Sequence, residues 1–141
     1  MPKSYYLDTC IWRDYLEERH TLSGRPLGEY AAKFFQKIIK SRDKILFSDS
    51  IIIELKRKYS LEEINQILNL LFLIGILNKI IITKDEFTEA KQLAIAREIP
   101  LGDCLHAILA RNHGAILVSQ DKHILNNLSD IVKTRRPEQI T

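Results

Sequence analysis

The chain has 141 residues, of which 45% are hydrophobic and 28% are charged, and its formal net charge is +3. This length is that of about one domain able to bury its own core, so we expect residues 1–141 to form a single domain. Collagen-like and disordered chains are excluded, because glycine is scarce and the apolar content is high. The mildly positive charge permits an anionic partner but does not require one.

The periodicity of hydrophobic residues predicts strands that alternate with helices. In chain order we expect a strand at 4–7, a helix at 9–16, a loop at 20–28, a helix at 29–40, a strand at 45–47, helices at 51–58 and from 60 through the apolar run 70–77, a strand at 80–83, helices at 85–97 and 103–112, a strand at 115–118, a short helix at 121–126 and a strand at 131–133. Apolar strands that alternate with helices are typical of a parallel sheet covered on both sides. We therefore expect an α/β fold.

The two cysteines and the apolar runs indicate where the protein works. Cys10 and Cys104 form no CxxC or Cys/His pattern, which argues against a zinc site or a disulfide and favours a reducing compartment. The apolar run 70–77 is far shorter than the roughly 20 residues that span a bilayer, and the first nine residues lack the apolar core of a signal peptide. We therefore expect a cytoplasmic protein with no membrane partner.

Acidic residues follow several of the predicted strands. In open parallel sheets the functional site lies outside the carboxyl ends of the strands. Asp8 directly follows the first strand and Asp121 follows the fourth, while Asp103 opens the helix that leads into the fourth strand. Glu54 comes shortly after the second strand, within an apolar run. We expect these four carboxylates to meet at one edge of the sheet.

Each acid also has a simpler explanation. Three of them stand where a residue that caps a helix N-terminus is common, and these are Asp8, Asp103 and Asp121. Glu54 has a simpler explanation in an ion pair along its helix, with Arg57 or with Lys58. His106 lies one turn after Asp103, and its two interpretations are a general acid and a hydrogen-bonded, half-buried side chain. The cysteines are interpreted as small apolar helix residues, not as nucleophiles.

Four segments around these acids carry a resemblance to a known family. They are YLDTCIW at 6–12, SIIIELKRK at 50–58, LGDCLHAILAR at 101–111 and LVSQDKHI at 117–124. In this order, and over almost the whole chain, they resemble the four motifs of PIN-domain nucleases of the small VapC-like toxin type. The resemblance implies a metal-dependent endoribonuclease with a three-layer, Rossmann-like α/β/α sandwich and strand order 3-2-1-4-5. It also implies an RNA substrate, an antitoxin protein that occludes the site, and a homodimer.

The resemblance extends to individual side chains. It implies that four acids are catalytic and hold the metal ion, and these are Asp8, Glu54, Asp103 and Asp121. Thr9 and Ser119 match hydroxyl positions of the family, where they orient an acid or a metal-bound water. Some relatives have a further acid a few residues after the fourth, but residues 125–127 here are Leu, Asn and Asn.

Electrostatics independently favours a cation at such a site. Two carboxylates about 5 Å apart repel by roughly 3 kcal/mol at an effective dielectric constant near 20. Hard divalent cations such as Mg²⁺ or Mn²⁺ prefer carboxylate and water ligands, and only a cation lets four acids accept an RNA phosphate. We therefore expect Mg²⁺ or Mn²⁺ as the cofactor, and raised pKa values for some of the four carboxyls when the metal is absent.

Basic residues next to the motifs are candidates for binding the RNA backbone. They are Arg13, Lys56, Arg57, Lys58 and Lys122. An ordinary solvated face is the alternative for these side chains.

Other functions compete with the toxin nuclease. A PIN nuclease that processes RNA without an antitoxin has the same acids, whereas a non-catalytic RNA-binding or protein-binding module on this fold would be favoured by the loss of one of them. A nucleotide-binding Rossmann protein is disfavoured, because the chain has neither GxGxxG nor a P-loop. A receiver domain needs an acidic pair after its first strand, and here Asp8 is followed by Thr9 and Cys10.

Overall fold

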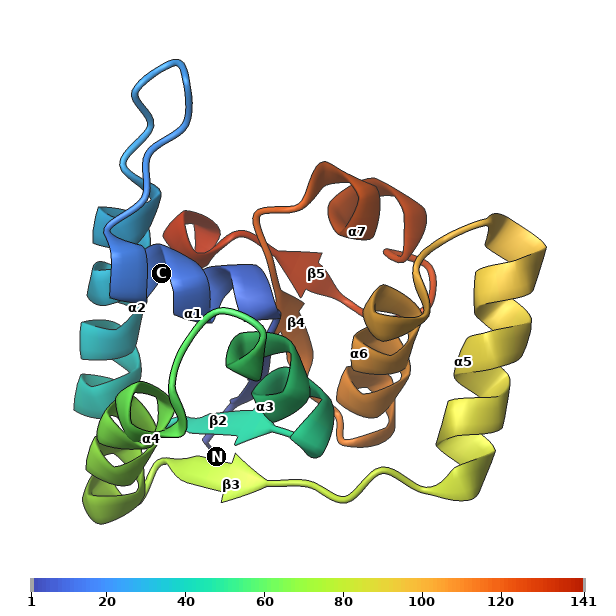
Figure 1. The fold of residues 1–141 in the computed structure, drawn as a ribbon, viewed down its shortest axis with the longest axis horizontal. Coiled ribbons are helices and arrows are strands. Elements are labelled where there is room, and N and C mark those ends of the chain that lie inside the picture. Colours follow the sequence, from blue (N-terminus) through green and yellow to red (C-terminus); the bar gives the residue numbers. More distant parts are fainter. Residues whose placement is uncertain (1, 141) are drawn as a thin grey trace.

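Strands that are apolar on both faces need helices on both sides of their sheet. The computed structural model describes residues 2–140 and contains a five-stranded parallel sheet with strand order β3-β2-β1-β4-β5 (Figure 1). The strands are β1 at Ser4–Leu7, β2 at Lys44–Phe47, β3 at Leu77–Lys79, β4 at Ile116–Val118 and β5 at Thr134–Arg135. The predicted fold class and strand order are confirmed.

The helices form two groups along the chain. They are α1 at Thr9–Glu17, α2 at Leu27–Ser41, α3 at Asp49–Lys56, α4 at Leu61–Ile74, α5 at Lys84–Arg97, α6 at Leu101–Asn112, α7 at Lys122–Asn127 and the 3-10 helix η1 at Pro137–Gln139. Because parallel crossovers are right-handed, the connections β1–β2 and β2–β3 place α1 to α4 on one face, and the return to β4 and β5 places α5 to α7 on the other. Figure 1 shows these two groups on opposite sides of the view. No helix within residues 2–140 is long and apolar enough to cross a membrane.

Helix α6 covers the middle of the sheet and is buried there. Tyr6 and Leu7 of β1, and Leu117 and Val118 of β4, are fully buried. Helix α6 packs against both strands, and its residues 104–110 are all buried. Full burial of one Leu, Ile or Phe side chain contributes about 1.5–3 kcal/mol to stability. This packing fixes the position of the first turn of α6 at the carboxyl edge of the sheet.

The third strand does not lie where the sequence predicts it. The prediction of 80–83 is wrong, because β3 is Leu77–Lys79. Gly75 ends α4 with a φ of 86°, a left-handed conformation that favours glycine, so the chain enters the sheet almost at once. Residues 80–83 then lead into α5, where Thr83 forms a capping box with Glu86.

The last strand is displaced as well. The predicted strand at 131–133 is wrong, because β5 is Thr134–Arg135. The amides of Ile131 and Val132 still donate to the carbonyl of Leu128, so these residues complete the turn after α7. Helix boundaries shift similarly, and the most consequential shift is that α6 begins at Leu101, two residues earlier than predicted.

Gly28 permits the contact between α1 and α2. A Cβ atom at this position would lie 2.5 Å from the Cα of Glu18 and 2.8 Å from the carbonyl oxygen of Asp14. Both are backbone atoms, so no side chain can move aside to make room. The start of α2 therefore reaches the last turn of α1 only because residue 28 has no side chain.

We predict that Gly28→Ala lowers the free energy of unfolding by about 1–3 kcal/mol, the usual cost of overpacking. The matched control is Gln36→Ala on the exposed side of α2, which should change it by less than about 0.5 kcal/mol. Urea unfolding followed by circular dichroism measures both. Equal midpoints for Gly28→Ala and the wild type would contradict the close helix contact.

Candidate active site

Asp8 lies at the carboxyl end of β1 and is held by three donors. As the N-cap of α1 it accepts a hydrogen bond from the backbone amide of Thr9, at 2.9 Å from Oδ1. Its other oxygen, Oδ2, accepts from the hydroxyl of Ser119 at 2.9 Å and from the thiol of Cys10 at 3.1 Å. The capping explanation is therefore correct for one oxygen, while the other is tied to the end of β4. The residue is only 6% exposed.

Ser119 connects Asp8 to Asp121. Its hydroxyl oxygen accepts a hydrogen bond from the backbone amide of Asp121 at 3.0 Å and donates its own proton to Asp8. Asp121 also caps α7, because its Oδ1 accepts from the backbone amide of His123 at 2.8 Å. One buried hydroxyl thus fixes the relative positions of the first and fourth acids of the sequence pattern.

Glu54 reaches out from α3, and both of its carboxylate oxygens have donors. Oε1 lies 3.1 Å from Nε2 of His106, and Oε2 accepts a hydrogen bond from the hydroxyl of Thr9. Burial raises the pKa of Glu54, but the hydrogen bond and charge of His106, together with the hydrogen bond from Thr9 and the charge of Arg57, outweigh this effect, and the net pKa is lowered. The predicted pairing with Lys58 is wrong, because Lys58 pairs instead with Glu17 at 2.8 Å. Arg57 forms no close ion pair with Glu54 among residues 2–140, but its positive charge also lowers the pKa of Glu54.

Gly102 allows α6 to approach this carboxylate. A Cβ atom at residue 102 would lie 2.8 Å from Oε1 of Glu54, which is closer than packed atoms come. The missing side chain therefore brings the first turn of α6 against Glu54, and the next residue in that turn is Asp103.

Asp103 is not a helix cap. Pro100 occupies the N-cap position of α6 and Leu101 is its first residue, so Asp103 stands inside the first turn. Its side chain is half-buried and makes no hydrogen bond to another side chain or to the backbone of residues 2–140. The structure thus rules out the simpler explanation for this acid.

The pKa of Asp103 shows that the four acids share one electrostatic environment. It is raised to about 6, first by burial and then by the negative charges of Asp8 and Asp121, with a smaller contribution from Glu54. The nearby His106 lowers it. Negative charge from four separate segments therefore accumulates around the carboxyl ends of β1 and β4.

The acids approach one another without forming a complete metal site. Across residues 2–140, no three His, Cys, Asp or Glu side chains lie close enough together to hold a metal ion by themselves. The contacts instead give two linked units, Asp8 with Asp121 through Ser119 and Glu54 with Thr9, next to Asp103. The donors are carboxylate oxygens, which fit Mg²⁺ or Mn²⁺, and Mg²⁺ usually keeps several waters and takes only one or two carboxylates.

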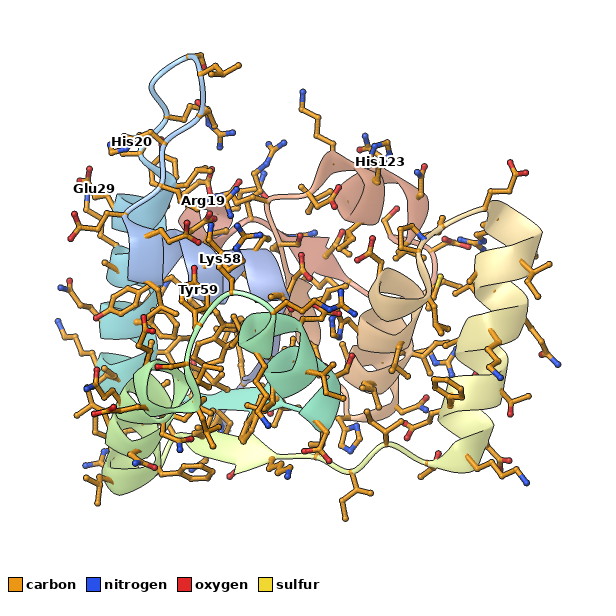
Figure 2. The ribbon with its side chains drawn as sticks, in the orientation of Figure 1. Arg19, His20, Glu29, Lys58, Tyr59 and His123 are labelled. Atoms are coloured by element: carbon orange, nitrogen blue, oxygen red, sulfur yellow. The ribbon has the colours of Figure 1, made fainter. Side chains whose placement is uncertain are left out.

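A small hollow with basic residues adjoins the acids. Its volume is about 260 Å³, and it is lined by Thr9, Cys10, Arg13, Glu54, Arg57 and Lys58. Arg13 and Lys58 are drawn together because both pair with Glu17, at 3.2 and 2.8 Å. Lys58 and Tyr59 lie over α1 (Figure 2), and both donate to Glu17. Of the predicted RNA-binding residues, Lys56 and Lys122 do not line this hollow.

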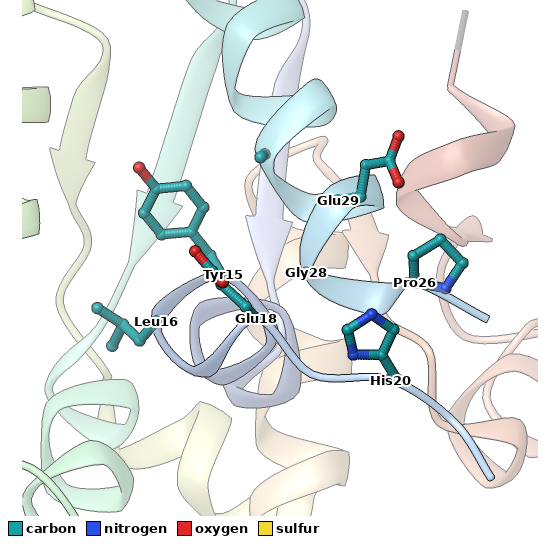
Figure 3. A pocket seen from close by; sticks show the side chains of 8 residues that line it. Tyr15, Leu16, Glu18, His20, Pro26, Gly28 and Glu29 are labelled. Carbon is teal, nitrogen blue, oxygen red and sulfur yellow. The ribbon is translucent and has the colours of Figure 1, made fainter. Parts of the chain in front are cut away.

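A larger hollow of about 630 Å³ lies at the other end of α1. Figure 3 shows Tyr15 and Leu16 of α1 on one side of it, and His20, Pro26 and Glu29 on the other. None of the four acids lines it, so it does not belong to the acidic site.

Some contacts at the site go beyond the sequence-based assignment. The sequence indicates only an apolar role for Cys10, yet its thiol donates to Asp8, and burial raises its pKa well above the ordinary value. His106 is fully buried and bonded to Tyr6 and Glu54, so it does not reach a substrate as a general acid. Tyr6 precedes Asp8 by two residues in extended backbone, and side chains two positions apart there point to the same face. This spacing is the signal in the sequence for a role of Tyr6 at the site.

Comparison with known proteins finds one matching family model and several solved structures with a similar fold. The family model described as PIN domain matches residues 5–129, and the comparison with curated proteins finds no relative. Among solved structures, VapBC2 of Rickettsia felis bound to a promoter DNA fragment is 18% identical with a TM-score of 0.65, covering 94% of this chain and 98% of that one. A toxin-antitoxin complex from Klebsiella pneumoniae is 16% identical with a TM-score of 0.64, covering 94% and 97%. DNA-bound VapBC of Salmonella typhimurium is 18% identical with a TM-score of 0.59, covering 97% and 99%.

Asp103 gives a pH-dependent prediction for the metal-free protein. Folding raises the pKa of this carboxyl from its ordinary value near 4 to about 6, so the folded state favours the protonated form. The contribution of Asp103 to stability is therefore present below about pH 4 and is lost as the pH rises through about 6. NMR titration should place its midpoint near pH 6, and Asp8→Asn should lower that midpoint by removing a neighbouring negative charge.

Urea unfolding at several pH values gives the matched control. At pH 8 the free energy of unfolding should be higher for Asp103→Asn than for the wild type, and at pH 4 this difference should be smaller. Asp85→Asn, at an exposed position in α5, should show no such dependence on pH. An ordinary midpoint near pH 4 for Asp103 would mean that the acids are not clustered.

Proposed function

Because the chain belongs to the PIN domain family, we propose that it is a metal-dependent endoribonuclease that hydrolyses RNA phosphodiester bonds. The observation that carries the proposal is the proximity of four acids at one edge of the sheet, where burial and the charges of Asp8, Asp121 and Glu54 raise the pKa of Asp103 to about 6. They are Asp8, Glu54, Asp103 and Asp121. Asp103 has no compensating donor among residues 2–140, and negative charge of this kind in a half-buried place favours the binding of a cation.

The chemistry of these donors suits Mg²⁺ or Mn²⁺. We assign Asp8 and Asp103 as direct ligands, while Asp121 and Glu54 complete the site directly or through metal-bound water. When bound, such an ion lowers the pKa of water and neutralises charge that develops on the phosphate. The three donors on Asp8 fix its orientation, and Ser119 and Thr9 orient Asp121 and Glu54.

The basic hollow next to the acids suits the RNA backbone. Arg13, Arg57 and Lys58 line it together with Glu54, so a phosphate held by them lies beside the acidic site. Lys56 and Lys122 are exposed outside the hollow, and we assign them to further phosphates of the bound RNA. Such contacts strengthen binding without reading the sequence of the RNA.

The same family membership supports a toxin that acts within a toxin-antitoxin pair. The three solved structures compared above share this fold at TM-scores of 0.59–0.65, and one of them is described as a toxin-antitoxin complex. We therefore propose an antitoxin protein that covers the acidic site, and a homodimer of this chain. The proposed location is the cytoplasm, where an RNA substrate and an antitoxin are both present.

Cleavage of a mixed set of structured RNAs tests the nuclease. The wild type should cut with Mn²⁺ or Mg²⁺ and stop with EDTA, and Asp8→Asn and Asp103→Asn should each lower the rate by about 100-fold or more, because each removes a ligand charge. Asparagine caps a helix as well as aspartate does, so Asp8→Asn keeps the N-cap of α1.

The control for this assay is Asp85→Asn, which removes an exposed acid of α5 and should cut like the wild type. Calorimetry with Mn²⁺ separates a wrong substrate from a wrong site. Binding to the wild type but not to the variants, without cleavage, would keep the site and reject the RNAs chosen. Neither binding nor cleavage would favour a non-catalytic binding module.

The basic hollow gives a prediction about salt dependence. For single-stranded nucleic acid, each phosphate that the protein neutralises adds about 0.7 to the steepness with which log K falls against log salt. In the inactive Asp8→Asn background, Arg57→Gln should therefore weaken RNA binding and make this slope shallower by about 0.7. Fluorescence anisotropy with a labelled single-stranded RNA over a salt series measures it.

The matched control for this measurement is Lys84→Gln. It removes the same charge from an exposed position in α5, which is outside the hollow. If the two variants had the same slope, Arg57 would affect RNA binding only through the net charge of the protein and not through a phosphate contact.

A further inference from the structure

A buried chain of hydrogen bonds runs from Ser48, the residue directly after β2, to the acidic site. The hydroxyl of Ser48 lies 2.7 Å from the hydroxyl of Tyr6, which lies 2.9 Å from Nδ1 of His106. The other ring nitrogen, Nε2, lies 3.1 Å from Oε1 of Glu54. Ser48, Tyr6 and His106 are fully buried, whereas the side chain of Glu54 is 24% exposed. The chain therefore begins in the core and ends at the one member that reaches solvent.

We propose that His106 is a positioning residue, which holds the Glu54 carboxylate in place at the acidic site and is itself oriented by Tyr6 and Ser48. The inference rests on the proposed function, because it concerns how one acid of the nuclease is prepared for the metal. His106 touches neither the substrate nor the metal and acts only through Glu54.

The order of donors in this chain follows from the protons that its members carry. Ser48 and Tyr6 have one proton each, and a neutral imidazole has one. If Ser48 donates to Tyr6 and Tyr6 donates to Nδ1, the ring proton stands on Nε2 and points at Glu54. Every proton then has an acceptor, so the tyrosine selects the tautomer that donates to the carboxylate.

The same chain also accommodates a charged imidazole. In that state Nδ1 donates to the tyrosine oxygen, and the hydroxyl of Tyr6 turns to Ser48. Because the Tyr6 and Ser48 hydroxyls can each donate or accept, Nε2 keeps its proton and its bond to Glu54 in both states. His106 thus offers a donor to Glu54 in both of its charge states.

Packing alone does not explain a histidine at this position. The neighbouring residues 104, 105 and 107–110 of α6 are apolar and buried, and a buried polar group costs free energy unless it is hydrogen-bonded. An apolar side chain would fill residue 106 without needing the two polar partners that His106 has, Tyr6 and Glu54. The hydrogen bonds to Tyr6 and Glu54 offset this cost. What the histidine adds beyond packing is a fixed position for Glu54.

Little more than one turn of helix α6 thereby fixes the positions of two acids, Glu54 and Asp103. Gly102 leaves the space for Oε1 of Glu54, Asp103 supplies its own carboxylate, and His106 supplies the donor. Thr9 of α1 holds the second oxygen of Glu54. A long glutamate arm loses rotamer freedom when it is ordered, and donors from two helices stabilise the ordered form before a metal ion arrives.

The decisive experiment compares His106→Leu with His106→Gln. Glutamine can place an amide donor near the position of Nε2, whereas leucine cannot. Mn²⁺ affinity by calorimetry and kcat of RNA cleavage should both fall by about 10- to 100-fold in His106→Leu, the usual effect of losing a group that orients a metal ligand. His106→Gln should recover most of this loss. KM for RNA should stay within about twofold in both variants, because the RNA contacts are unchanged.

Two further variants keep the test decisive. His113→Leu removes an exposed histidine after α6 and should behave like the wild type. If His106→Leu does not fold, Tyr6→Phe decides the question: it keeps the ring and removes the hydroxyl that bonds Nδ1 and Ser48. Mn²⁺ affinity and kcat should then fall by a smaller factor, below about 10-fold.

The outcomes separate the inference from the proposed function. Wild-type Mn²⁺ affinity and kcat in folded His106→Leu, or in Tyr6→Phe where the first variant fails to fold, would overturn the positioning role and leave the nuclease intact. An equal loss in His106→Leu and His106→Gln would also overturn it, because the donor would then not matter. A wild type that neither binds Mn²⁺ nor cuts RNA would reject both proposals together.

Discussion

The buried carboxylate of Asp8 at the end of the central strand is the constraint around which the site is built. A charge at a position only 6% exposed is stable only when it is well solvated by protein groups. The backbone amide of Thr9, the hydroxyl of Ser119 and the thiol of Cys10 provide this solvation. Because Ser119 also binds the amide of Asp121, the stabilisation of one acid places another.

The four acids differ in how the protein satisfies them, and this difference suggests a division of roles. Asp8, Glu54 and Asp121 all accept hydrogen bonds from donors that fix their orientation. Asp103 lacks such a donor among residues 2–140, and its pKa is raised by burial and by the negative charges of its neighbours. Its negative charge is therefore disfavoured in the free protein, and a cation would stabilise it.

The central part of the fold can be predicted from sequence because local signals agree there. The runs around Tyr6, Leu46 and Leu117 are short, apolar and bounded by polar residues, and each forms a strand paired with its neighbours. The edge strands β3 and β5 are harder to place, because each is short and pairs with only one neighbouring strand. Which part of an extended segment such as 76–83 pairs is decided by the neighbouring strand, and the residue types do not record it.

The positions of the acids after strands can be read from the sequence, but their partners cannot. The capping signal is right for Asp8 and Asp121, and wrong for Asp103 because α6 begins two residues earlier. The bond from His106 to Glu54 joins residues 52 positions apart. No local pattern encodes such a contact, since it depends on how α3 and α6 pack across the carboxyl edge of the sheet.

Helix α6 connects the rigid apolar core to the polar site. Its buried face packs on β1 and β4 and leaves the helix no freedom to shift. The same helix carries Asp103 and the donor to Glu54, so the positions of two acids follow from apolar packing on the far side of the same turns. A site on such an element is held more precisely than one on a loop. The free energy that stabilises the fold therefore also fixes the geometry of the acids.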